Sequence, residues 1–163
     1  MVFERLLRHP PERVWQALTD PAQLREWSPF SADRNLATTG PAIVSMIDGE
    51  VSEDSESVVT VADAPRLLEY TWGDGVLRWE LEPEASGTRL TLRHTIPDET
   101  YLSKVAAGWH ICLVVADYFM DGTPVGPIVG ERALEYGWEE LNDSYAELLQ
   151  APNTGWPQAA SQP

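Results

Sequence analysis

The sequence predicts an α+β fold, in which a curved antiparallel β-sheet covers its apolar face with one long helix near the C-terminus. Two short helical patterns, each begun by a proline, follow a first strand pattern within residues 2–27. Segments between residues 42 and 94 then alternate apolar with polar residues and are separated by turns, as antiparallel hairpins do. Residues 101–120 form an apolar segment of helical length. Because the other face of such a sheet is polar, the apolar face needs this helix as its cover.

The first elements are a strand at residues 2–8 and two short helices. Pro11 suits the first turn of a helix, because the N–H that proline lacks has no intrahelical partner there. Asp20 is a good N-cap for the second helix, which is predicted at residues 21–27. The apolar positions of the two helices are Val14, Trp15, Leu18, Leu24 and Trp27. We expect the two tryptophans to seal this end of the sheet.

Four strand patterns follow, and each has one apolar face. Residues 42–47 lead into the turn Asp48-Gly49, after which the acidic run Glu50–Glu56 is either a solvated loop or an edge strand. Turns that contain glycine separate the later strands, at residues 73–75 and 85–87. The residues that share the inner face of these later strands are Leu68, Tyr70, Trp72, Leu77, Trp79, Leu81, Leu90, Leu92 and His94.

The C-terminal part of the chain is predicted to be helical. One side of the helix at residues 101–120 carries Val105, Trp109, Cys112, Ala116 and Phe119, and the opposite side carries Ser103, His110 and Asp117. Residues 122–130 form a proline-rich apolar loop, which is either a lid or a linker. A further helix at residues 131–150 has the apolar stripe Leu134, Trp138, Leu141, Tyr145 and Leu148. We expect one domain at residues 1–150 and a disordered tail at residues 151–163.

Composition excludes several classes of function. The 163 residues include 11 Lys and Arg against 26 Asp and Glu, and the net charge of −15 disfavours nucleic acid and anionic membranes. The single cysteine excludes an intrachain disulfide, and no cysteine–histidine spacing indicates a metal site. Without a secretory leader or membrane-spanning segment in the sequence, we expect a cytoplasmic monomer or homodimer that needs no cofactor.

Five segments, in order along the chain, resemble a known family. The chain is similar to the SRPBCC (START/Bet v 1-like) superfamily, in the branch named for the C-terminal domain of the activator of Hsp90 ATPase. The segments that carry this resemblance are residues 10–27, 67–72, 87–94 and 108–113, with Trp138, Leu141 and Tyr145. The resemblance implies a helix-grip fold with a deep apolar cavity. The family includes lipid and hormone carriers as well as polyketide cyclases and aromatases.

The candidate ligand-binding residues lie where this fold would place the cavity wall. They are Trp27, Phe30, Tyr70, Trp72, Trp79, His94, Trp109, Cys112 and Ala116. Trp72, Trp79 and Trp109 either fill the space or stack on a planar ligand. His94 is a ligand's polar anchor, a general acid or base, or a core histidine bonded to a neighbour. Buried free cysteines are usually inert, and we expect no reactivity of Cys112.

These residues leave three functions open. The first is a binding protein that holds a small hydrophobic molecule, aromatic or polyketide-like, in an internal cavity. The second is a cofactor-independent cyclase, dehydratase or isomerase of natural-product metabolism, with His94 as the catalytic acid or base. The third is a protein-interaction domain that acts as a co-chaperone, which the family name implies.

Overall fold

The computed structural model of the chain describes residues 1–48 and 51–156. The N-terminal part holds β1 (Val2–Leu7), α1 (Pro11–Thr19) and α2 (Pro21–Leu24). The central strands are β2 (Phe30–Ala32), β3 (Gly40–Asp48), β4 (Val51–Asp63), β5 (Leu67–Trp72), β6 (Gly75–Glu84) and β7 (Gly87–His94). The C-terminal part holds the 3₁₀ helices η1 (Glu99–Tyr101) and η2 (Gly130–Tyr136) and the helices α3 (Leu102–Met120) and α4 (Trp138–Leu149).

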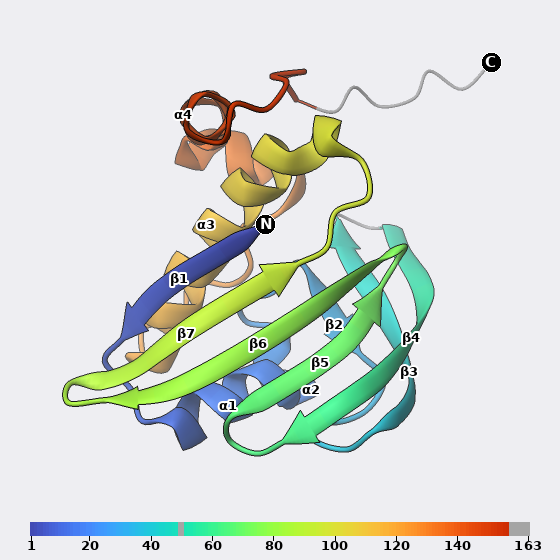
Figure 1. Cartoon of the computed structure of the whole chain (residues 1–163), viewed down its shortest axis with the longest axis vertical. Coiled ribbons are helices and arrows are strands. Elements are labelled where there is room, and N and C mark those ends of the chain that lie inside the picture. The colour runs from blue at the N-terminus through green and yellow to red at the C-terminus, as the bar shows by residue number, and fades with distance from the viewer. Residues whose placement is uncertain (49–50, 157–163) are drawn as a thin grey trace.

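The strands form one antiparallel sheet of seven strands in the order β1-β7-β6-β5-β4-β3-β2. Figure 1 shows this sheet curling in front of α3, with α1 and α2 behind its lower end and α4 beside α3. The predicted α+β fold, a curved antiparallel sheet around a long helix with two short helices after the first strand, is therefore confirmed. None of the helices in residues 1–48 and 51–156 is long and apolar enough to cross a membrane.

The two short helices form as their proline and capping residues predict, but α2 is shorter than expected. The Asp20 carboxylate accepts a hydrogen bond of 2.9 Å from the backbone N–H of Ala22, which caps α2. The predicted end at Trp27 is wrong, because α2 ends at Leu24. There the carbonyl of Leu24 accepts from the N–H of both Trp27 and Ser28. This tightened turn directs the chain into β2, a strand of three residues that was too short to predict from periodicity.

Removing the cap of α2 is expected to have a modest effect on stability. Asp20→Ala leaves the first N–H groups of α2 without their side-chain acceptor, so the free energy of unfolding should fall by about 1 kcal/mol. Urea unfolding followed by circular dichroism measures this change. The exposed Asp74→Ala serves as the matched control and should change stability by less than about 0.5 kcal/mol. Equal effects of the two substitutions would contradict the capping role.

The acidic segment after β3 is part of a strand. Residues 53–57 of β4 pair with β3, whereas the register with β5 begins only at Val59. The first half of β4 therefore lies at a local edge of the sheet, although β4 as a whole is an inner strand. Charged side chains protect such an edge from pairing with other chains. The predicted turn continues from Asp48 into residues 49–50, which lie outside the described residues.

Helix α3 is buried on two sides. Trp109, Cys112 and Ala116 face the sheet as predicted, and each is less than 5% exposed. Ser103, which we predicted on a polar side, is fully buried, and its hydroxyl donates to the carbonyl of Pro152. His110 is half-buried and forms a hydrogen bond of 2.9 Å with the hydroxyl of Tyr145. This side of α3 is therefore covered by α4 and the segment after it at Ser103 and His110, whereas the side chain of Asp117 near the helix end stays 38% exposed.

The C-terminal helix differs from its prediction in two ways. Residues 131–150 do not form one helix, because Gly137 adopts a left-handed conformation (φ 80°) between η2 and α4. Leu148, predicted in the apolar stripe, is 73% exposed. The tail was predicted to begin at residue 151, yet residues 151–156 are described and fold back on α4. The ring of Trp156 lies 4.7 Å from that of Trp138, centroid to centroid. The rest of that tail, residues 157–163, lies outside the described residues.

Candidate functional site

Two neighbouring cavities lie between the end of the sheet and α3. We call the smaller one, about 180 Å³, the apolar cavity and the larger one, about 490 Å³, the His94 cavity. They share three wall residues, which are Met46, Trp72 and Val105. A molecule that displaces one of these side chains therefore reaches both spaces.

The apolar cavity is built by segments that are far apart in the sequence. Trp72 at the end of β5 forms one wall, and Trp109 and Cys112 of α3 form another. Burial raises the pKa of the Cys112 thiol to about 12, so the sulfur stays protonated and serves as apolar lining. The remaining wall comes from positions that the sequence did not assign to a site, mainly Met46, Val105, Ile128, Val129, Trp138 and Trp156. The loop at residues 122–130 thus contributes directly to the cavity.

The His94 cavity opens at the end of β7. Its floor contains His94 and Trp72, whose rings lie 5.3 Å apart with an interplanar angle of 35°. Gly75 lies against this wall, and a Cβ atom there would come within 2.3 Å of the carbonyl oxygen of Thr95. A side chain at this position would therefore push the two strand ends apart. Acidic residues stand around the cavity, namely Glu53, Asp54, Asp74 and Asp98.

The hydrogen bonds of His94 fix its proton. The indole N–H of Trp109 donates to Nδ1 of His94 over 3.2 Å, so Nδ1 holds a lone pair and the proton of the neutral ring is on Nε2. Burial, and next the positive charge of the N-terminal ammonium of Met1, lower the pKa of His94 to about 4. The ring is therefore neutral at physiological pH. Within the described part of the chain, Nε2 has no hydrogen-bond partner.

This geometry determines what His94 can do chemically. The residue is 7% exposed, and it offers a hydrogen-bond donor at Nε2 to whatever enters the cavity. To accept a proton at Nε2, the ring would first need its own proton on Nδ1, where Trp109 already points its N–H, and it would then be charged in a largely buried site. The arrangement therefore favours a donor to a ligand oxygen over a general base.

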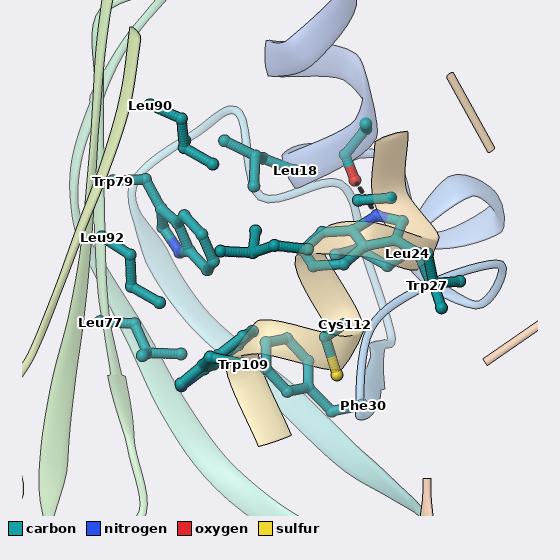
Figure 2. Packing of buried hydrophobic residues seen from close by; sticks show 14 of the residues in the cluster. Leu18, Leu24, Trp27, Phe30, Leu77, Trp79, Leu90, Leu92, Trp109 and Cys112 are labelled. Atoms are coloured by element: carbon teal, nitrogen blue, oxygen red, sulfur yellow. Dashed lines mark hydrogen bonds between the residues drawn. The ribbon is translucent and has the colours of Figure 1, made fainter. Parts of the chain in front are cut away.

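Five of the predicted wall residues are in the core instead. Trp27, Phe30, Tyr70, Trp79 and Ala116 are at most 4% exposed and line neither of the two cavities. Figure 2 shows the rings of Trp27, Phe30, Trp79 and Trp109 packed among leucines of the sheet and of the two short helices. The structure therefore brings four predicted residues together at the cavities, which are Trp72, His94, Trp109 and Cys112.

The polar atoms of the core tryptophans are satisfied within the core. The indole N–H of Trp27 donates to the carbonyl of Ala17 over 2.9 Å, which joins the turn after α2 to α1. The indole N–H of Trp79 donates to the hydroxyl of Tyr70 over 3.1 Å. Trp15 is 7% exposed and belongs to the same cluster. Trp15 and Trp27 thus close the short-helix end of the sheet, as expected.

The curled sheet, its central helix and the cavity between them define a helix-grip protein. The family model described as Activator of Hsp90 ATPase homolog 1-like protein matches residues 8–115. The chain therefore belongs to this family, a branch of the SRPBCC superfamily that includes ligand-binding and polyketide cyclase-like proteins. A comparison with the curated proteins gives no match.

Solved structures with low sequence identity share the fold. CalU16 from Micromonospora echinospora is 21% identical, with a TM-score of 0.66 over 91% of this chain and 86% of its own. A conserved protein of unknown function from Enterococcus faecalis is 19% identical, with a TM-score of 0.68 over 91% and 83%. The AHSA1-like protein from Aeromonas hydrophila is 20% identical, with a TM-score of 0.63 over 75% and 92%. These similarities confirm the predicted helix-grip fold.

Proposed function

We propose that the protein binds a small, hydrophobic, aromatic molecule that carries a hydrogen-bond acceptor. The observation that carries this proposal is the free N–H at Nε2 of His94, a largely buried residue that lines a cavity beside the ring of Trp72. An incoming carbonyl, ether or hydroxyl oxygen can replace water at this donor, and the hydrogen bond then fixes the ligand's orientation in the cavity. The apolar cavity next to it offers tryptophan faces for the rest of the molecule.

The charges around the entrance narrow the class of ligand. Four acidic residues line the His94 cavity, and none of its lining residues in the described part of the chain is Lys or Arg. Electrostatic repulsion from this negative surface would oppose binding of a carboxylate or phosphate. It would not oppose binding of a neutral or cationic molecule. The preferred ligands are therefore neutral or amine-bearing aromatic compounds of the polyketide kind, rather than fatty acids or acyl phosphates.

Catalysis is the second candidate, since the family includes cyclase-like proteins. Cyclisation or isomerisation that begins with proton removal would need a base in the cavity. The bond from Trp109 leaves His94 as a donor. A carrier or sequestration protein needs only the donor and the apolar walls, so these contacts favour binding without turnover. The family name suggests a co-chaperone role. No contact within the described residues supports it.

A dye titration tests the proposal. Nile red is a neutral aromatic dye with a carbonyl acceptor, and we expect saturable micromolar binding that quenches tryptophan emission. His94→Asn keeps an oxygen near the position of Nδ1 for Trp109 but removes the donor at Nε2. It should weaken binding about tenfold, the effect of one hydrogen bond of about 1.4 kcal/mol. Trp72→Leu should weaken it as well, because it removes a shared wall of both cavities.

The matched control is His110→Asn. His110 lies on α3 next to Trp109, but its Nδ1 pairs with the hydroxyl of Tyr145 away from both cavities. Its replacement should leave dye affinity unchanged. Equal affinity of His94→Asn and the unmodified protein would contradict the anchor role, and no binding of Nile red or of a panel of aromatic ketones would overturn the function. A bound ketone that is converted to a different compound, detected by a change in mass or, for an isomer, in chromatographic retention, would establish the enzyme instead.

A further inference from the structure

A second group of chemically active side chains lies at the other end of β1 from His94. His9 follows β1 at the corner before α1, and Asp117 and Asp121 are one turn apart at the end of α3. One donor atom from each of these three residues lies within 4.8 Å of the other two. Strand β1 pairs with β7 in the register Val2↔Arg93 and Leu7↔Thr88. The group is therefore separate from both ligand cavities.

The contacts in this group are not ordinary hydrogen bonds. Nε2 of His9 lies 3.1 Å from Oδ1 of Asp121 and 3.7 Å from Oδ1 of Asp117. Nε2 is nevertheless shielded from solvent and has no hydrogen-bond partner, so the shorter contact lacks the direction that an N–H bond requires. Oδ1 of Asp117 is also buried and without a partner. Two unsatisfied buried atoms thus lie 3.7 Å apart, beside the carboxylate of Asp121.

Two carboxylates of like charge meet at this position, in a pocket that Arg5 and Arg8 also line. Asp117 and Asp121 are like charges at i and i+4; Asp117 lies in the last turn of α3 and Asp121 is its C-cap, where the helix dipole is negative. The guanidinium of Arg8 contacts only the outer oxygen of Asp121, Oδ2, at 3.4 Å. The two inner oxygens face His9, whose ring is 13% exposed. A cation between them would neutralise the helix end and pair both orphaned atoms.

We propose that His9, Asp117 and Asp121 bind one divalent transition-metal ion of the Zn²⁺ type. Ligand atoms about 2.0–2.1 Å from a tetrahedral metal are about 3.3 Å apart, and both contacts of Nε2 are close to this separation. One imidazole and two carboxylates are a donor set that suits Zn²⁺, Co²⁺ or Mn²⁺ better than Ca²⁺ or Mg²⁺. Water completes the coordination. No local sequence pattern predicts this site, because His9 and Asp117 are 108 positions apart.

Such an ion would connect the β1–α1 corner to the end of α3. These segments also meet through Arg8 and Asp121, so the metal would strengthen a contact that already exists. Binding to the folded chain alone raises stability in proportion to the logarithm of the free metal concentration. The role inferred here is structural, and it is independent of the proposed ligand binding.

Metal titration of the tag-free chain tests the proposal. Zn²⁺ titrated calorimetrically into the protein is expected to bind with a stoichiometry of one, and Co²⁺ should give the visible absorption of a low-symmetry site. Melting temperature should rise with Zn²⁺ concentration. His9→Asn and Asp117→Asn should each weaken Zn²⁺ binding at least tenfold and abolish the Co²⁺ absorption. Circular dichroism confirms that each variant is folded, and Asp121→Asn replaces either variant that is not.

Two matched controls separate this site from other histidines and carboxylates. His110→Asn and Asp143→Asn change the same residue types on α3 and α4, outside the group, and should bind Zn²⁺ as the unmodified chain does. The proposal is overturned if the unmodified chain takes up no stoichiometric Zn²⁺ or Co²⁺. It is equally overturned if His9→Asn and Asp117→Asn bind these ions as tightly as the controls do.

Discussion

Trp79→Ala is expected to lower the free energy of unfolding by about 3–5 kcal/mol, the range for removing a large aromatic side chain from a core. Trp79 is fully buried in the middle of β6, and its ring contacts those of Trp27 and Trp109 at centroid distances of 6.2 and 5.3 Å. The substitution also leaves the buried hydroxyl of Tyr70 without its indole donor. Urea unfolding followed by circular dichroism measures the loss.

Leu148→Ala is the control for this experiment. Leu148 is 73% exposed, and its truncation should change stability by less than about 0.5 kcal/mol. Dye binding by Trp79→Ala, measured where the variant is folded, distinguishes a core residue from a cavity wall. A stability loss below about 1 kcal/mol together with lost dye binding would mean that Trp79 lines the ligand site, as the sequence alone suggested.

Acidification is expected to destabilise the protein through His94 by about 2 kcal/mol. The pKa of His94 is about 4 in the folded state, against 6.5 for an unperturbed histidine. Above pH 6.5 the ring is neutral in both states. Between pH 6.5 and about 4 the unfolded chain binds a proton that the folded protein does not, so stability falls as the pH falls. Complete burial would make this loss about 3 kcal/mol, and solvent in the cavity reduces it.

The comparison of unmodified protein with His94→Asn isolates this contribution. Ion pairs with Arg78 lower the pKa of Glu69 and of Glu80, and these carboxylates also lose stabilising contacts in acid. They do so equally in both proteins, so the difference between the two urea-unfolding curves at pH 7 and pH 4 reports on His94. If the free energy of unfolding changes equally with pH in the two proteins, protonation of His94 does not destabilise the fold, and the prediction is wrong.

The fold was largely predictable because its sheet alternates cleanly. Residues 67–94 form three strands whose inner residues are all at least half-buried, and turns mark their ends. Hydrophobic periodicity did not predict burial correctly where other elements pack on two sides of a helix. Helix α3 lies between the sheet and α4, so apolar residues cover most of its surface, and its few polar residues do not show which side is exposed. Ser103 was misplaced for this reason.

The candidate site was predicted in part, and the errors have a common cause. Alternation shows which face of a strand a residue occupies, but not its depth along the strand. Trp79 lies in the middle of β6, where α3 fills the space, whereas Trp72 is the last residue of β5, where the space opens. Trp138 and Trp156 reach the apolar cavity only because the chain after α3 folds back on it. No local sequence pattern predicts this reversal.

The aromatic rings also have an optical consequence. Trp27, Trp79, Trp109 and Trp72 form a continuous series, with centroid separations of 6.2, 5.3 and 5.8 Å from the closed end of the sheet to the cavities. Indoles held this close in fixed, asymmetric orientations couple their electronic transitions and share absorbed energy. The protein should therefore show strong near-ultraviolet circular dichroism, which disappears when tertiary packing is lost. A molecule that contacts Trp72 alone should alter the spectrum of the whole series.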